Sequence, residues 1–159
     1  MNVTFAPKGL LQIDDAKIIF RNFRGEGGKF NREGDRNFAI IIDDQDICDA
    51  LVKEGWNVKI KAPREEGDMP FMYLTVKVKF NGNGPRVYLE TGDRQNRLDE
   101  NSVSILDDID ICKADLDIAP YDWATNGKTG RTAYLRALRV TQEVDRFQHV
   151  DSDAGVPWN

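Results

Sequence analysis

Two stretches of the chain, residues 56–62 and 71–80, alternate strictly between apolar and polar side chains. The apolar positions are Trp56, Val58, Ile60, Ala62, Met72, Leu74, Val76, Val78 and Phe80. A repeat of two residues is the period of a β-strand that buries one face and exposes the other. The sequence therefore predicts a hairpin of two half-buried strands joined by a charged loop, with Trp56, Leu74 and Phe80 in the core.

The other face of this hairpin is cationic. It carries four lysines, one tyrosine and no acidic residue: Lys59, Lys61, Lys77, Lys79 and Tyr73. Proteins that bind single-stranded nucleic acids combine cations along the phosphates with flat rings beneath the bases. Lysine is also common on the exposed faces and edge strands of ordinary sheets. The alternation alone therefore supports a binding face and a plain solvated face about equally.

The rest of the chain predicts further strands and one helix. Strands are expected at residues 16–24, 36–43, 86–90, 110–121 and 131–142. A helix of about ten residues begins after Asp43 or Asp44, which would cap it, and ends at Gly55. With the hairpin, this makes about seven strands and one helix between strands.

Turn residues and changes of phase refine this picture. Asn126-Gly127 marks a tight hairpin turn, and the phase change at Cys112 predicts a β-bulge. Residues 91–108 are expected to be mostly loop, with a short ordered piece at residues 103–106. A mainly β chain with long hairpins and one helix favours a small closed Greek-key barrel, and a β-sandwich is the alternative. A parallel α/β fold is disfavoured because it would need more helices.

The composition indicates one acidic domain whose charges are segregated. The 159 residues are 40% hydrophobic, and the formal net charge of −5 argues against general nonspecific binding to nucleic acid. Residues 1–42 hold seven Lys or Arg against five acids, whereas residues 90–117 hold nine acids against three Lys or Arg. A basic front can therefore bind an anion while the acidic remainder keeps the protein soluble and selective.

Targeting signals and cysteines favour the cytoplasm. The apolar runs are too short to span a bilayer, and the first residues lack the layout of a signal peptide. Cys48 and Cys112 are the only cysteines, and without an export signal we expect reduced thiols. We expect a cytoplasmic protein with no membrane association.

No catalytic or zinc-binding set is recognisable. The single histidine, His149, lies in a polar tail, which is a poor place to hold it beside a nucleophile. A zinc site needs about four Cys or His ligands, and the chain has three such residues. The tripeptide that begins at Gly127 lacks the earlier glycine of a P-loop, because Asp122 stands there. We predict a protein that is not an enzyme and that uses no cofactor and no metal.

Asp115 and Asp117 project from one face of the strand predicted at residues 110–121. Carboxylates that converge can hold Mg²⁺ for phosphodiester cleavage. No lysine or histidine joins them at a recognisable spacing, so a solvated acidic face is the favoured interpretation. A metal-dependent nuclease is the minor alternative.

Basic and aromatic residues are the strongest functional signal. The candidate nucleic-acid-binding residues are Arg24, Lys29, Phe30, Arg32, Lys59, Lys61, Tyr73, Lys77, Lys79, Arg86 and Tyr88. Phe30 lies between Lys29 and Arg32 in a Gly-rich loop, residues 25–36, and is hard to explain as a core residue. Arg86 and Tyr88 share one face of the strand that follows the hairpin.

Five segments carry a resemblance to a known family: AKIIFRNFRG, ALVKEGWNVK, YLTVKVKF, PRVYL and ADLDIAPYDWATNGKTGRTAYLRALRV. With them, most of residues 8–145 resembles the OB-fold single-stranded-DNA-binding proteins of tailed bacteriophages and prophages. The resemblance implies an OB-fold-like Greek-key domain over residues 1–145. It implies a non-catalytic protein that coats single-stranded DNA in phage DNA replication, recombination or repair. OB-folds bind on the face of strands two and three with flanking loops, which matches the hairpin and the loop at residues 25–36.

The acidic tail, residues 146–159, bears a second resemblance. Its candidate partner-binding residues are Asp151, Asp153, Pro157 and Trp158. Bacterial single-stranded-DNA-binding proteins often end in acids followed by a proline and an aromatic residue, which dock replication partners. This chain departs from the pattern because Asn159 follows the aromatic residue. The resemblance implies docking of replication or recombination proteins, and a frayed terminus is the alternative.

Several properties stay open at the level of the sequence. A homo-oligomer and a monomer are both compatible with it, and so are a preference for DNA and one for RNA. The competing function is a structural or protein-interaction barrel of a phage that binds no nucleic acid.

Overall fold

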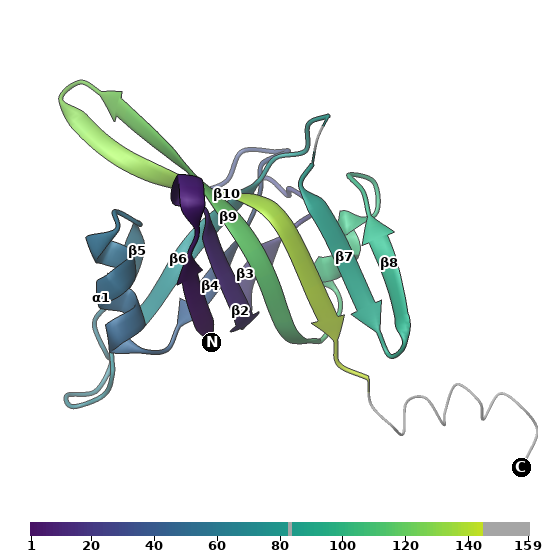
Figure 1. Ribbon diagram of the computed structural model, residues 1–159, viewed down its shortest axis with the longest axis horizontal. Coiled ribbons are helices and arrows are strands. Elements are labelled where there is room, and N and C mark those ends of the chain that lie inside the picture. Colours follow the sequence, from purple (N-terminus) through teal and green to yellow (C-terminus); the bar gives the residue numbers. More distant parts are fainter. Residues whose placement is uncertain (83, 145–159) are drawn as a thin grey trace, which may run out of the picture.

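The computed structural model describes residues 1–82 and 84–144, which form one ten-stranded mixed β-sheet (Figure 1). The strands are β1 (Asn2–Phe5), β2 (Leu11–Ala16), β3 (Ile18–Asn22), β4 (Arg36–Ile42), β5 (Val58–Lys61), β6 (Phe71–Val78), β7 (Arg86–Thr91), β8 (Arg94–Leu98), β9 (Ile111–Thr125) and β10 (Lys128–Gln142). The strand order is β1-β2-β9-β10-β6-β4-β3, while β5 pairs with β6, and β7 pairs with β10 and β8. The predicted mainly β class is confirmed. The predicted closure is not seen, because no described ladder joins the end strands β1 and β3.

Strand β10 is the centre of the sheet because it pairs with three others. It runs antiparallel to β9 along its whole length and parallel to β6 at Ala133 and Tyr134. A bulge lies between Leu135 and Ala137. Beyond it, from Ala137 to Thr141, β10 pairs with β7, again in parallel. The bulge therefore marks the point where the sheet divides into a β6 branch and a β7–β8 branch.

The one α-helix among the described residues, α1 (Gln45–Lys53), begins and ends as expected. The Asp44 carboxylate accepts hydrogen bonds from the N–H groups of Asp46 and Ile47, which satisfies two free donors of the first turn. Gly55 follows the helix with a φ of 100°, a conformation that glycine adopts without strain. None of the described helices is long and apolar enough to cross a membrane.

The core lies under the inward rows of the sheet. Trp56 and Leu74 are buried, and Phe80 is partly buried against the core. Phe23 and Phe38 stack at a centroid distance of 5.1 Å in the fully buried interior. The period-two pattern thus predicted the inward face of β6 correctly. It failed on β5, where Ile60 is 56% exposed and Ala62 is exposed too, because this short edge strand pairs only with β6 and leaves the core.

Strands β1, β2 and β8 were not predicted. The strand expected at residues 16–24 is β3. The segment before it forms β2, which pairs with β9. Strand β8 lies inside the region expected as loop, because only Leu98 of its five residues is buried and its polar sequence shows no alternation. The short ordered piece predicted there is the 3-10 turn η2 (Val103–Asp107), and a second such turn, η1, spans Pro7–Gly9.

Two local predictions on the β9–β10 hairpin are confirmed. The pairing steps from Lys113 to Ile111 against consecutive residues of β10, so Cys112 is the bulged residue. Asn126 and Gly127 form the two-residue turn, both with positive φ. Cys112 is exposed and Cys48 is buried in α1, and both are free thiols.

Candidate nucleic-acid interface

The outward row of β6 gathers the predicted hairpin residues on one face. Lys59 of β5 lies opposite Tyr73, and Lys61 lies opposite Phe71. Further along β6, Tyr134 of β10 lies beside Lys77. Side chains that are paired across a ladder point to the same face. Strand β6 therefore joins the lysines of β5 to an aromatic residue of β10 that is distant in sequence.

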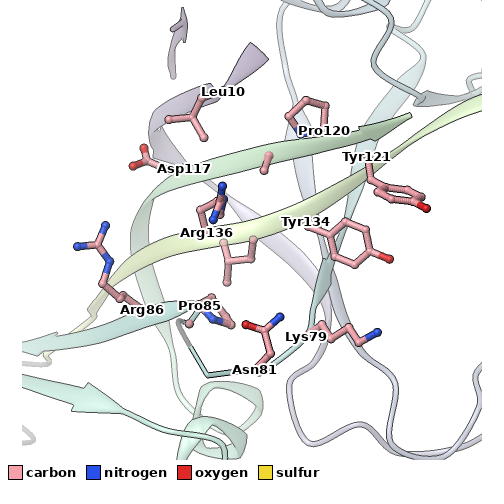
Figure 2. A pocket seen from close by; sticks show the side chains of 13 residues that line it. Leu10, Lys79, Asn81, Pro85, Arg86, Asp117, Pro120, Tyr121, Tyr134 and Arg136 are labelled. Atoms are coloured by element: carbon pink, nitrogen blue, oxygen red, sulfur yellow. The ribbon is translucent and has the colours of Figure 1, made fainter. Parts of the chain in front are cut away.

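Two hollows meet on this face. The first, of about 870 Å³, is lined by Lys79, Arg86, Tyr121, Tyr134 and Arg136 among others (Figure 2). The second, of about 790 Å³, reaches from the loop at residues 28–36 across Thr75 and Lys77. Both are lined by Lys79 and Tyr134, so we treat them as one groove.

The groove is positive. Its charged lining consists of six cations and three acids: Arg32, Arg36, Lys77, Lys79, Arg86, Arg136, Asp35, Glu100 and Asp117. Arg36 and Glu100 form an ion pair with 3.5 Å between Nη1 and Oε1, which leaves five cations against two acids for a ligand. A polyanion would be attracted to such a surface although the whole chain is acidic.

Two tyrosines come to the groove from the β9–β10 hairpin. Tyr121 and Tyr134 pack edge to face with ring centroids 6.1 Å apart, and Figure 2 shows both rings at the same end of the first hollow as Lys79. Tyr121 is exposed. Edge-to-face packing holds the rings in place and leaves ring surface open.

Phe30 occupies the tip of the Gly-rich loop and is 93% exposed. The loop beneath it is ordered by Asn31, whose Nδ2 donates to the carbonyl oxygens of Glu26 and Asp35 at 2.9 Å each. Asn37 of β4 donates to Asn31 Oδ1 at 2.9 Å. Phe30 therefore extends into solvent from an ordered loop and lines the edge of the second hollow. The Lys29 ammonium lies 5.4 Å from the centre of its ring.

Arg24, another predicted contact, is engaged within the fold. Its Nε lies 3.1 Å from Asp107 Oδ2, and its Nη2 lies 2.7 Å from Asp108 Oδ2. The hydrogen bond and the charge of Asp108 raise the pKa of the Arg24 guanidinium above its ordinary value. This pairing engages Nε and Nη2 with two carboxylates, so we leave Arg24 out of the groove.

The remaining predicted residues fall into three places. Arg86 lines the first hollow. Tyr88 lies one step further along β7, between Arg97 of β8 and Arg139 of β10, and lines neither hollow. Lys59, Lys61 and Tyr73 also lie outside the groove lining, in a patch next to it.

Of the two acids Asp115 and Asp117 on β9, Asp115 is engaged within the fold. Asp115 Oδ2 accepts from Arg139 Nη2 at 2.7 Å, and its Oδ1 accepts from the Asp15 N–H at 2.9 Å. Burial alone would raise the pKa of Asp115, but these hydrogen bonds lower it below its ordinary value. The described residues contain no group of three or more His, Cys, Asp or Glu placed to hold a metal ion.

Pattern reasoning missed Tyr121, Tyr134 and Arg136, and also Phe20 and Phe71 next to the groove. The outward phase of Tyr121 and Tyr134 was readable from the alternation of their strands. Their position beside Lys79 was not, since it depends on the parallel pairing of β10 with β6. The predicted tail residues Asp151, Asp153, Pro157 and Trp158, and also His149, lie outside the described residues.

Comparisons with known proteins concern the fold and the family of this chain. The fold is similar to that of the single-stranded DNA-binding protein from bacteriophage Enc34, with a TM-score of 0.57, 10% identity, and coverage of 99% of this chain and 94% of that one. A C-terminal truncation of that protein gives 0.56, 15% identity and 91% of each chain. Its complex with ssDNA gives 0.55, 12% identity, and 92% and 93% of the two chains.

At these identities the likeness concerns the fold alone. No curated protein sequence matched significantly. A family model described as "Putative phage ssDNA-binding domain" matches residues 2–156, which is nearly the whole chain. The resemblance expected from the sequence is thereby confirmed, and the chain belongs to the phage ssDNA-binding domain family.

Proposed function

We propose that this protein binds single-stranded DNA along the groove, as a non-catalytic protein of phage DNA replication, recombination or repair. One observation carries the proposal: the two hollows share Lys79 and Tyr134, which makes a single path lined by cations and aromatic rings. Membership of the family and the fold shared with a protein solved in complex with ssDNA support it.

The groove residues divide into two roles. Lys77, Lys79 and Arg86 supply mobile positive charges for phosphates, and Tyr134 supplies a ring for a base. Phe30 supplies a second ring from the loop at the other end of the groove. Stacking contributes on the order of 1–3 kcal/mol per base and tolerates any sequence, because every base has a flat face. We therefore expect binding with little sequence preference.

A single strand fits this arrangement better than a duplex. The rings can stack only on bases whose faces are free, and in a duplex each base face is covered by its neighbours. Phosphate contacts alone would attract both forms. The ratio of the affinities for single-stranded and duplex DNA therefore measures how much the aromatic residues contribute to binding.

The test is titration of a fluorescently labelled oligothymidine, followed by anisotropy at about 50 and about 200 mM salt. We expect tight binding at low salt, a steep loss at higher salt, and poor competition by duplex DNA of equal length. No binding at low salt would contradict the proposal and favour the structural or protein-interaction role. Equal affinity for duplex would contradict the single-strand preference.

A nuclease assay tests the absence of catalysis. We expect a labelled strand to stay intact when the protein and Mg²⁺ are added, because Arg139 and a backbone N–H already occupy Asp115. Cleavage that depends on Mg²⁺ and is lost in Asp115→Asn would show that the protein is an enzyme.

A further inference from the structure

Three aromatic residues form an exposed patch beside the groove. Phe20 of β3 packs edge to face on Tyr73 at 5.4 Å and on Phe71 at 6.3 Å between ring centroids. Phe71 and Tyr73 are 5.5 Å apart. We call Phe20, Phe71 and Tyr73 the aromatic patch. Lys59 and Lys61 of β5 lie directly across the ladder from Tyr73 and Phe71.

Phe20 holds an unfavourable backbone conformation. Its φ is 51°, a region that costs a bulky residue free energy and that usually persists only where the surroundings enforce it. It lies in a bulge of β3, where the pairing with β4 steps from Ile19 to Asn22. The bulge turns the ring outward, and the side chain is 58% exposed. Burial in the core therefore does not explain a large ring at this strained position.

Within the patch, Tyr73 is the support and the two phenylalanines are the open surface. Tyr73 is half-buried, and its ring is contacted by Phe20, by Phe71 and by the Lys61 ammonium at 5.6 Å. Phe71 is 36% exposed and Phe20 more so. A base can stack on a ring that has free surface, so Phe20 and Phe71 are better placed for this than Tyr73.

The patch is continuous with the groove. A third hollow, of about 510 Å³, is lined by Phe20 and Asn37, and Asn37 also lines the second hollow. Its far side holds Arg24, Glu26, Asp107 and Asp108, and Arg24 is paired with both aspartates. A strand that follows the second hollow past Lys77 and Thr75 therefore meets Phe20 next. Strands β5 and β6 contribute three lysines, Lys59, Lys61 and Lys77, and no acid along this route, which favours a polyanion as the occupant.

The geometry points to a second base-stacking site for single-stranded DNA, with Phe20 and Phe71 beneath bases, Lys59 and Lys61 at phosphates, and Tyr73 as a positioning residue. This inference rests on the proposed function and extends it. Its consequence is a dependence on length: a short strand is held by the groove alone, and a longer one gains contacts at the aromatic patch. Single-strand binders of this kind cover about 4–16 nucleotides per OB-fold.

Phe20→Gly is the main test. Glycine accepts a positive φ, so this variant removes the ring and relieves the strain together. We expect its thermal midpoint to stay close to that of the wild type, while affinity for an oligothymidine of about 16 nucleotides falls roughly fivefold or more. Affinity for a strand of about six nucleotides should change much less. A residue with a merely structural role would give the opposite result, a lower midpoint with unchanged affinity.

Three further variants sharpen the result. Phe71→Ala should reproduce the length-dependent loss, and Phe20→Trp should restore long-strand affinity because it returns a flat ring. Val52→Ala removes an exposed apolar side chain from α1 and should change nothing. Photocrosslinking of the wild type with a 5-iododeoxyuridine strand, mapped by mass spectrometry, should label the peptide that contains Phe20.

The outcomes separate this inference from the proposed function. If Phe20→Gly and Phe71→Ala bind all lengths like the wild type and no crosslink maps to β3 or β6, the second site is overturned and the groove stands. If the wild type binds no single strand, the proposed function itself fails. If Phe20→Gly does not fold, the crosslink and Phe71→Ala decide the matter.

Discussion

The outward face of β5 and β6 and the acid-rich surface around β9 and η2 use positive charge in different ways. On the acid-rich surface, arginines are locked in ion pairs: Arg24 with Asp107 and Asp108, and Arg139 with Asp115. On the β5–β6 face, the cations are lysines: Lys59, Lys61, Lys77 and, just after β6, Lys79. Within residues 1–82 and 84–144, none of these four forms an ion pair within 4.0 Å.

The difference shows which cations serve the fold and which are free for a ligand. A guanidinium holds a planar fork of donors that fits a carboxylate or several carbonyl oxygens, so it suits fixed internal contacts. Arg21 is a further case, since its Nη1 donates to the Leu106 and Ile109 carbonyl oxygens at 2.7 and 2.6 Å. A lysine ammonium is a mobile point charge and suits phosphates whose positions vary along a strand.

The largest expected effect is on the arginine side, at Asp107. Its side chain is only 9% exposed, and its carboxylate accepts from the N–H groups of Phe23 and Arg24 at 2.8 and 3.0 Å. Asp107→Ala should lower the free energy of unfolding by about 2–3 kcal/mol, because the N–H of buried Phe23 loses its charged acceptor. Urea denaturation followed by circular dichroism measures this loss.

Asp108→Ala is the matched control, because Asp108 contacts the same arginine from an exposed position. An exposed ion pair adds little to stability, so this variant should unfold almost like the wild type. An equal loss in both variants would show that Arg24, and not the backbone N–H groups, carries the contribution of Asp107.

The next effect concerns the lysine side. Replacing Lys59, Lys61, Lys77 and Lys79 by alanine should leave folding intact and reduce the salt dependence of DNA binding. Single strands give a slope of about 0.7 per phosphate contact. Four contacts then make the wild type lose roughly 50-fold more affinity than the variant between about 50 and about 200 mM salt. Anisotropy titrations at both concentrations give this ratio.

A variant with the same change in net charge separates local contacts from the general field. Replacing Lys17, Lys53, Lys113 and Arg94 by alanine removes four positive charges from other surfaces. It should keep most of the wild-type salt dependence. If the two quadruple variants behave alike, net charge governs binding and the β5–β6 face has no special part in it.

A smaller effect is expected at Tyr134, one of the two residues that line both hollows. Tyr134→Ala should weaken binding of oligothymidine roughly tenfold, within the range measured for loss of one stacking ring. Tyr134→Phe keeps the ring and should bind almost like the wild type. A large loss in Tyr134→Phe would assign the contribution to the hydroxyl group, and the stacking role would be wrong.

Local patterns in the sequence predicted the parts of the fold that depend on neighbours. The inward and outward rows of β6, the cap at Asp44, the turn at Asn126 and the bulge at Cys112 all follow from residues close in the chain. Strand β8 was not predicted because its sequence does not alternate. It pairs with β7 because a tight turn joins the two strands.

The candidate site was only half predictable for the same reason. The row of lysines is local, whereas Tyr134 reaches Lys77 through a parallel pairing between distant strands. Arg24 looked free because its partner Asp107 lies in a segment expected as loop. Phe20 was hidden by a bulge that reverses the phase of β3. The sequence shows which residues are charged or aromatic. Which of them lie together depends on the pairing of distant strands, and only the structure shows that.

The smallest expected effect concerns pH and distinguishes the two surfaces once more. Because hydrogen bonds hold the pKa of Asp115 below its ordinary value, its contribution to stability is complete above the unfolded-state pKa, about 3.9. That contribution is lost as the pH falls through the lower, folded-state pKa. Asp115→Asn should therefore be less stable than the wild type at pH 7, and the difference should vanish in strong acid. Urea denaturation at about pH 7, 4 and 2 measures it.

Asp117→Asn is the control for this pH series, since Asp117 lies on the same face of β9 but forms no ion pair in the part of the chain that the structure describes. We expect it to follow the wild type at every pH. DNA binding of Asp115→Asn should stay close to that of the wild type, because Asp115 lines neither hollow. Asp117 lines the first hollow, so Asp117→Asn serves as a control for stability alone. A parallel loss of DNA binding and stability in Asp115→Asn would mean that the acid-rich surface around β9 and η2 also shapes the groove. The two surfaces would then not have separate roles.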